Sequence, residues 1–345
     1  MPSSPSTMQD IARRAGVHAS TVSRALRNDP RITPGQRQKI LRAAKDLDYR
    51  SNPLVAALMT ARRTRSVTPY RATLGFLKKH AASEAAWFGR TYGQLFSGAH
   101  ARALAQGYHL EEFNLADPEL TPRRITEILR HRGVHGLLVA PLHSVQDSID
   151  LDWSHFCTVA VGFSLQQVPV SRVAHNHFSG LTLATRHCRG LGYRRLGLVL
   201  QERVAEKVEQ RWVAAALLDQ SEQPAVDRVE PLLLDEWDEP TFATWFRKHR
   251  PEVILGVNLN EVPHWLGRLG CRVPRDVGLV SLDRRASDRG IAGIDQDYAR
   301  VGGNAVDVMI GMLHRNERGL PDQPATVLSD GTWIDGRSLR VRRKR

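Results

Sequence analysis

The stretch that decides the fold of the N-terminal region runs from residue 7 to residue 26 and reads TMQDIARRAGVHASTVSRAL. Small and apolar residues recur in its first half at helical spacing: Met8, Ile11, Ala12 and Ala15. Thr7 is a favourable N-cap for this helix, and Asp10 places a negative charge near its positive end. Gly16 is predicted to end the helix, and a second helix is expected after one turn.

Two further helices are predicted downstream. The second has an apolar stripe at Ala19, Val22 and Leu26. The third is expected to start at Thr33, because a threonine cap followed by a first-position proline is typical of helix starts. Its buried face is predicted to contain Ile40, Leu41, Ala44 and Leu47. Two short helices around a glycine turn, braced by a third, predict a helix-turn-helix, although an ordinary three-helix bundle has the same spacing.

Positive charge is concentrated at the two ends of the chain. The 345 residues, enough for two or three domains, carry a net charge of +13. Residues 1–66 contain thirteen Lys or Arg and four Asp or Glu, and residues 337–345 add six basic residues and no acidic one. The stretch between them is nearly neutral. A basic head on a neutral body is typical of a nucleic-acid-binding module joined to another domain. We expect the basic tail, residues 337–345, to be a solvated, frayed end; weak attraction to DNA or RNA is the alternative.

The head resembles that of the lactose-repressor/galactose-repressor (LacI/GalR) family of transcriptional regulators. The similarity covers Thr7–Val17 and Thr21–Leu26. It continues at isolated positions: Arg37, Ile40, Ala43, Leu47, Tyr49, Asn52 and Pro53. The resemblance implies a helix-turn-helix DNA-binding domain over residues 1–50.

The resemblance also assigns DNA contacts. Ala19, Ser20 and Arg24 stand where family members read bases, and an arginine can bond a guanine through two donors. Contacts with the DNA backbone are implied for a second set: Thr7, His18, Thr21, Ser23, Arg27 and Asn52. Two of these depart from the family pattern, which has Ser or Thr at position 18 and Asn at position 27. His18 is expected either to cap the recognition helix poorly or to contact phosphate.

Residues 51–70 resemble the family's hinge helix and linker. A helix over Asn52–Thr60 is too short to be stable alone, so we expect it to fold only when DNA and a second subunit are present. Leu58 aligns with the leucine that family members insert into the minor groove, and Val55 and Ala57 lie beside it. Burial of Leu58 against the body is the alternative.

Residues 71–336 alternate between apolar runs and amphipathic segments. Strands are predicted over residues 72–77, 108–115, 134–140, 156–162, 196–200, 232–234, 253–257 and 277–282. Helices are predicted over residues 92–106, 121–132, 179–191, 207–220, 241–249 and 261–269. This alternation implies parallel sheets with right-handed crossovers. The fold class is therefore a small all-α head plus an α/β body, and two such lobes resemble the type I periplasmic-binding-protein fold that the family uses to bind effectors.

Ligands in such sheets bind at the carboxyl ends of the strands. Asp283 and Asn258 each follow a strand and align with ligand-binding residues of the family. A carboxylate and an amide each form paired hydrogen bonds with neighbouring hydroxyls. A salt bridge or helix cap is the alternative role for Asp283, and a turn is the alternative for Asn258.

Other expected effector contacts depart from the family. His175 stands where members usually have an aspartate. Many family members bind the effector with an arginine at the position that aligns with Val208. Lys207 and Arg211 lie beside this position, and Arg211 is the predicted substitute. Trp87 and Phe88, with Tyr92 nearby, are expected either to stack on a sugar ring or to pack in the core.

Other classes are disfavoured. The sequence contains no HExxH, GxSxG or GxxxxGK[ST] motif, so no enzyme is expected. His175 and His177 lack further metal-ligand types nearby, and neither a metal nor a cofactor is expected. The three cysteines are widely spaced, and no secretory signal or membrane span is seen, which indicates a cytoplasmic protein.

We therefore expect a repressor that binds a palindromic operator in double-stranded DNA as a homodimer, with its affinity modulated by a small-molecule effector, expected to be a carbohydrate. The alternative is an effector-independent regulator whose cleft is degenerate or binds protein.

Overall fold

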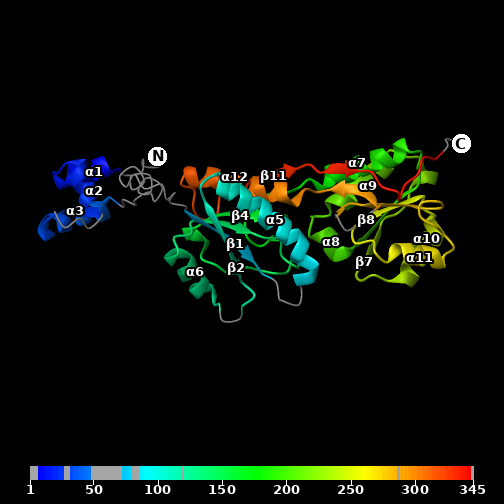
Figure 1. Cartoon of the computed structure of the whole chain (residues 1–345), viewed down its shortest axis with the longest axis horizontal. Coiled ribbons are helices and arrows are strands. Elements are labelled where there is room, and N and C mark those ends of the chain that lie inside the picture. Colours follow the sequence, from blue (N-terminus) through cyan, green and yellow to red (C-terminus); the bar gives the residue numbers. More distant parts are fainter. Residues whose placement is uncertain are drawn as a thin grey trace. The chain divides into compact units, whose positions relative to one another are not determined.

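A computed structural model describes residues 7–26, 32–47, 72–79, 85–117, 120–285, 288 and 290–342 of the chain (Figure 1). The chain divides into two compact units, Met1–Tyr70 and Arg71–Arg345, which we call the head and the body.

The head contains three described helices: α1 (Met8–Ala15), α2 (Ala19–Leu26) and α3 (Pro34–Asp46). Their starts follow the predicted capping chemistry. The Asp10 amide donates to Thr7 Oγ1 at 3.3 Å while the Thr7 amide donates to Asp10 Oδ2 at 2.9 Å, which forms a capping box. The Thr33 hydroxyl likewise accepts from the Gln36 amide, and Gly16 ends α1 with a φ of 65°.

The head has its own small hydrophobic core. It consists of Ile11, Ala12, Ala15, Val22, Ala25, Ile32, Ile40, Ala43 and Ala44. The prediction for α3 was wrong at one position, because Leu41 is 46% exposed and Ala43 faces the core instead. Counted from Ile40, position 43 lies on the same face of a helix, whereas position 41 is rotated away from it.

The first lobe of the body is built on a parallel sheet of order β11-β5-β4-β3-β1-β2. Its strands are β1 (Thr73–Lys78), β2 (His109–Asn114), β3 (Gly136–Val139), β4 (Cys157–Val161), β5 (Ser171–His175) and β11 (Thr326–Ser329). Its helices are α5 (Ala85–Ala105), α6 (Pro122–His131) and α12 (Tyr298–His314). The central strands are buried on both faces, as continuous apolar runs predict.

The second lobe repeats this topology with the order β12-β10-β9-β8-β6-β7. Its strands are β6 (Leu196–Gln201), β7 (Leu232–Leu234), β8 (Val253–Gly256), β9 (Gly278–Ser281), β10 (Ala292–Asp295) and β12 (Thr332–Ile334). Its helices are α7 (His177–Gly190), α8 (Glu202–Glu206), α9 (Arg211–Ser221), α10 (Glu239–His249) and α11 (Val262–Arg268). Only β12 runs antiparallel to its neighbour among the described pairs. The chain crosses between lobes after β5, after β10 and after β11.

Two helices differ from the prediction. Helix α5 begins at Ala85 rather than at residue 92. The segment expected to be a single helix over residues 207–220 is helical only from Arg211, and a separate helix, α8, precedes it. Glu209 and Gln210 between them adopt the left-handed conformation, with φ of 53° and 56°. Lys207, the C-cap of α8, precedes this break and lines the cavity described below.

Helices α5 and α12 cross closely on one face of the first lobe, beside each other in Figure 1. Gly98 and Gly302 permit this approach. A Cβ atom at Gly302 would overlap the backbone carbonyl oxygen of Leu95, and one at Gly98 would overlap that of Ala299. Helix α12 and the short strands β5, β10, β11 and β12 were not predicted from the sequence.

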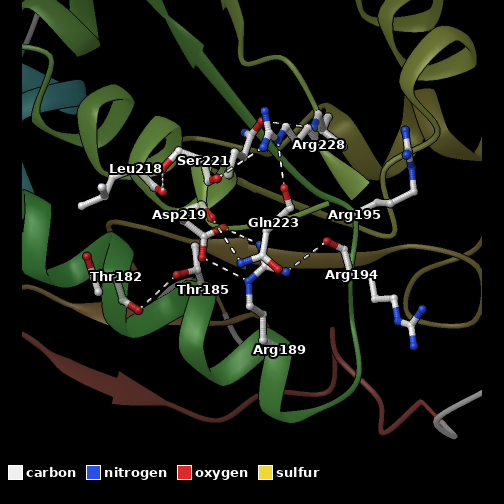
Figure 2. Close-up of polar contacts among 12 residues, drawn as sticks. Thr182, Thr185, Arg189, Arg194, Arg195, Leu218, Asp219, Ser221, Gln223 and Arg228 are labelled. Carbon is white, nitrogen blue, oxygen red and sulfur yellow. Dashed lines mark hydrogen bonds and ion pairs between the residues drawn. The ribbon is translucent and has the colours of Figure 1, made fainter. Parts of the chain in front are cut away.

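A charged fork joins α7 to α9 on the second lobe. Arg189 Nε and Nη2 donate to the two carboxylate oxygens of Asp219 at 3.1 and 2.5 Å, and its Nη1 donates to the Arg194 carbonyl (Figure 2). Both side chains of the pair are largely buried. A bidentate pair of this kind fixes the relative position of the two helices.

The expectation of a frayed C-terminal tail was wrong for residues 337–342. The buried Ser338 hydroxyl donates to the Leu279 carbonyl at 2.6 Å, and Leu339 packs on the second-lobe core. Arg342 pairs with Glu252 and lies 5.1 Å from the centre of the Tyr193 ring. Serine and leucine between the arginines supply the anchoring contacts, which a count of charges does not reveal.

Candidate DNA-binding face and effector cavity

Helix α2 presents the predicted base-reading residues on one side. Val22 and Ala25 are buried in the head core, whereas Ser20 is exposed and Arg24 is partly exposed. Ala19 also packs partly against the core. This orientation follows from helical spacing, since the residues that reach solvent lie opposite the apolar stripe.

His18 caps this helix. Its Nδ1 accepts a hydrogen bond from the Ser20 amide at 3.3 Å and lies 3.0 Å from the Ser20 hydroxyl. The ring therefore replaces the serine or threonine expected at an N-cap. Only a neutral ring whose Nδ1 carries no hydrogen can accept this bond.

The other predicted DNA contacts divide into two groups. Thr7, Thr21 and Ser23 lie on described helices or their caps, with Thr7 exposed and the other two partly exposed. The remaining positions lie outside the described residues: Arg27, Asn52, Val55, Ala57 and Leu58.

The body encloses a cavity of about 150 Å³. Its wall comes from the carboxyl ends of strands in both lobes and from the helix starts that follow them. The first lobe supplies Tyr92, Pro141 and Phe163, among others. The second supplies Asn258 and Asp283. This is the position at which open parallel sheets bind ligands.

Asp283 lies at the centre of a polar contact between the lobes. Its Oδ1 accepts from the Tyr298 hydroxyl at 2.9 Å, and its Oδ2 lies 3.0 Å from Arg285 Nη2. Asp283 follows β9 of the second lobe, whereas Tyr298 begins α12, which packs on the first lobe. Burial, and then the adjacent Asp283, raises the pKa of Tyr298 well above its usual value. The salt bridge considered for Asp283 is thus present, and Asp283 also lines the cavity.

Asn258 and His175 lie in the same wall. Asn258 has a φ of 55°, so the turn considered for it is present as well. Burial lowers the pKa of His175 to about 4, and burial followed by His175 and Arg211 lowers that of His177 well below its usual value. The two rings meet edge to face at 5.1 Å. Both are therefore neutral at pH 7.

Arg211, Trp87 and Phe88 have different positions. Arg211 is not among the lining residues; its guanidinium lies 4.2 Å from the centre of the Phe163 ring, which does line the cavity. Lys207 lines the wall instead. Trp87 and Phe88 lie in the first turn of α5, and their side chains are outside the described part of the structure.

Sequence reasoning did not name several lining residues as ligand contacts: Phe163, His177, Trp212, Arg285 and Tyr298. Two of these residues could have been predicted from their positions in the sequence. Phe163 follows the predicted strand 156–162 directly, and Arg285 lies two residues after Asp283. Tyr298 had no such signal, because the strand before it and the helix it begins were not predicted.

Comparison with known proteins identifies both units. The family model for bacterial regulatory proteins, lacI family, matches residues 7–52, and that for a periplasmic binding protein-like domain matches residues 185–339. An HTH-type transcriptional repressor PurR of Haemophilus influenzae (strain PittEE) is 25% identical over 332 residues, which cover 91% of this chain and 93% of the relative. The chain belongs to the LacI family of bacterial regulatory proteins.

The LacI-family assignment confirms the recognition made from the head and makes the chain a DNA-binding transcriptional repressor rather than an enzyme. Another relative, the HTH-type transcriptional regulator MalR of Staphylococcus xylosus, is 24% identical over 206 residues, covering 59% of this chain and 58% of the relative. None of the helices described in the structure is both long and apolar enough to cross a lipid bilayer. Within the same residues, no group of three or more His, Cys, Asp or Glu side chains forms a metal site.

Solved structures support the predicted fold class. The transcriptional regulator CelR–cellobiose complex aligns with a TM-score of 0.56 and 18% identity, over 96% of this chain and 99% of the other. The lac repressor dimer bound to operator and the anti-inducer ONPF aligns with a TM-score of 0.56 and 17% identity, over 98% and 100%. Together with the two family models, these alignments confirm a helix-turn-helix head and a periplasmic-binding-protein-like body.

Proposed function

We propose that this LacI-family chain acts in the cytoplasm as a homodimer that binds a palindromic operator. Its affinity for the operator changes when a small molecule binds in the body cavity. The observation that carries the proposal is α2, whose exposed side bears Ser20 and Arg24 on a strongly basic head. The lac repressor structure, a dimer bound to operator, supports the same arrangement for this chain. Two-fold symmetry of the protein requires matching half-sites in the DNA.

In this proposal some residues of the head contact base edges and others contact the DNA backbone. Arg24 and Ser20 meet base edges, with Ala19 in apolar contact beside them. Thr7, Thr21 and Ser23 anchor the backbone and carry no sequence information themselves. His18 and Arg27 add phosphate contacts. Asn52 anchors the hinge, from which Leu58, flanked by Val55 and Ala57, enters the minor groove.

The cavity is proposed to control the distance between the two hinge segments of the dimer. The Asp283–Tyr298 hydrogen bond joins the lobes across the cavity, so a ligand that contacts either residue favours one lobe arrangement over another. DNA affinity changes only as far as the ligand distinguishes these arrangements. The CelR–cellobiose complex and a CCPA structure from Weissella paramesenteroides with bound glucose support a carbohydrate-sized effector.

An effector-independent regulator is the second candidate. It is favoured by the engagement of both Asp283 carboxylate oxygens with Arg285 and Tyr298, which leaves fewer acceptor positions for a ligand. The cavity volume of about 150 Å³ favours the ligand-controlled function instead.

A selection of operators from random-sequence DNA tests the head. Arg24→Ala should relax the preference at one base position per half-site and cost about 1–3 kcal/mol at the preferred operator. Arg123→Ala, which removes the same charge from an exposed site on the body, is the matched control and should leave the selected sequence unchanged. A uniform loss of affinity in Arg24→Ala, with an unaltered consensus, would reassign Arg24 to phosphate contact.

The hinge is tested separately by footprinting. Leu58→Gly should abolish specific operator binding while salt-sensitive binding to any duplex remains. A footprint that survives this substitution rules out the minor-groove wedge.

A further inference from the structure

The charged groups in the wall of the body cavity already have partners. Asp283 Oδ2 lies 3.0 Å from Arg285 Nη2, and its Oδ1 accepts a hydrogen bond from the Tyr298 hydroxyl at 2.9 Å. Lys207 is engaged as well, and Asp147 lies near enough to stabilise its charge. An ionic ligand would lose its hydration without meeting an unpaired charge among the described lining residues. The wall therefore favours a neutral ligand.

Two polar side chains of the wall are open to a ligand. Thr91 and Asn258 line the cavity, are partly exposed, and make no side-chain hydrogen bond within the described part of the chain. The Asn258 amide places an acceptor oxygen and a donor nitrogen side by side. A pyranose carries hydroxyls around its whole edge, and each buried hydroxyl needs a partner. Two open side chains do not satisfy such a ring, whereas the Asn258 amide matches a ligand with one amide group.

The rest of the wall is mainly hydrocarbon and aromatic ring. It includes Tyr92, Val208, Trp212 and Val257. An apolar cavity of roughly 150 Å³ accommodates a single benzene ring, as a cavity engineered in another protein does. The volume and lining of this cavity thus suit one flat apolar ring better than a polyhydroxylated one.

We propose that the effector is a small neutral aromatic amide: a single apolar ring held among Tyr92, Val208 and Trp212, with an amide group that forms paired hydrogen bonds with Asn258. The inference rests on the proposed role of this cavity as the effector site and specifies the class of ligand. Tyr92 belongs to α5 of the first lobe and Asn258 follows β8 of the second, so such a ligand contacts both lobes.

Calorimetric titration of the full-length protein with benzamide tests the amide group. Benzene has the same ring without the amide and should bind about tenfold more weakly, because the hydrogen bonds to Asn258 are lost. Benzoate carries a charge in place of the amide and should also bind at least about tenfold more weakly. Benzene that binds as tightly as benzamide overturns the amide contact, and tighter binding of benzoate overturns the neutral ligand.

Two polar rings test the apolar part of the cavity in the same titration. Glucose carries hydroxyls around its ring, and uracil carries carbonyl and N–H groups around a flat one. Both should bind more weakly than benzamide, because their buried polar groups lack partners in this wall. Tighter binding of glucose overturns the proposal, and tighter binding of uracil overturns the apolar ring.

A substitution tests Asn258 itself. Asn258 has a φ of 55°, which glycine adopts without strain, so Asn258→Gly removes the amide and preserves the backbone. It should weaken benzamide about tenfold and leave benzene unchanged. Asn316→Gly, at an exposed position of the body with a φ of 57°, is the matched control and should alter neither. An equal loss of benzamide and benzene in Asn258→Gly overturns the pairing; should this variant fail to fold, the comparison of the two ligands on the unaltered protein decides.

Operator footprints separate this inference from the proposed function. They are recorded on the unaltered protein with and without each probe. Glucose that binds more tightly than benzamide and changes the footprint contradicts the aromatic amide but upholds effector control. If Asn258→Gly weakens benzamide, and the footprint of the unaltered protein is nevertheless the same with and without saturating benzamide, effector control itself is contradicted.

Discussion

The head and the body build their candidate sites in different ways. Ser20 and Arg24 lie four residues apart on α2, and the cap at His18 is the residue before that helix. The cavity instead collects side chains from residue 91 to residue 301, which come from several strand ends and several helices of both lobes. A site on one helix depends on local geometry, so it tolerates changes elsewhere. A site made of strand ends depends on every packing contact that aligns the two sheets.

The largest expected effect tests this dependence at the α5–α12 crossing. Gly302→Ala should destabilise the body by about 3 kcal/mol, because its Cβ would meet the Leu95 backbone. Gly303→Ala is the control, since its Cβ would have 3.7 Å to the nearest atom, the Arg102 Cβ. All seven tryptophans lie in the body, so urea unfolding followed by their fluorescence reports on this unit. Equal stability of the two variants would show that α5 and α12 can move apart to accommodate the added methyl group. The cavity would then depend less on this packing contact than the comparison with the head implies.

Lowering the pH should reduce the free energy of unfolding of the body more than that of the head. The folded-state pKa of His175 lies near 4, below its ordinary 6.5, so below pH 6.5 the unfolded chain binds the proton that the folded chain excludes. Stability should then fall by about 1.4 kcal/mol per pH unit for this group, or about 2 kcal/mol between pH 6.5 and pH 5.

His175→Gln should reduce this slope in urea unfolding measured by tryptophan fluorescence. His131→Gln, on the exposed surface of α6, should leave it unchanged. An identical slope in all three proteins would contradict the exclusion of the proton from the cavity wall.

A smaller effect is expected at the contact between the lobes. Tyr298→Phe removes one hydrogen bond to a charged group and should cost the body about 1.5 kcal/mol. Tyr108→Phe is a suitable control, because the Tyr108 hydroxyl makes only a long contact, at 3.4 Å, with His314 Nε2. Thermal unfolding measures both. A loss confined to Tyr108→Phe would mean that the Asp283 contact does not stabilise the body.

The smallest effect is expected in the head. Thr33→Ala removes the N-cap of α3 and should cost about 1 kcal/mol of head stability. Hydrogen exchange measured peptide by peptide should accelerate over residues 33–47 and remain unchanged in the body. Faster exchange in body peptides as well would break the comparison, since it would tie the two units into one cooperative structure.

The accuracy of prediction differed between the two regions for the same reason. The capping residues Thr7 and Thr33 and the turn at Gly16 were readable because each acts within four residues of its own position. The long apolar runs at β3 and β4 were likewise readable. Strands β10 and β12 were not, because their sequences, AGID and TWI, contain no uninterrupted apolar run that distinguishes them from a loop.

The sequence alone determined that the chain has a helix-turn-helix head, an α/β body of alternating strands and helices, and polar residues at the ends of two strands. Only the tertiary structure decided that Arg285 and Tyr298 bind the two carboxylate oxygens of Asp283. It also decided that Lys207 rather than Arg211 lines the cavity, and that a hydrogen bond of Ser338 anchors the basic tail. Helix starts and strand faces follow from interactions between near neighbours in the chain. Contacts between strand ends depend on sheet order and on the angle between lobes, which are set by packing among residues far apart in sequence.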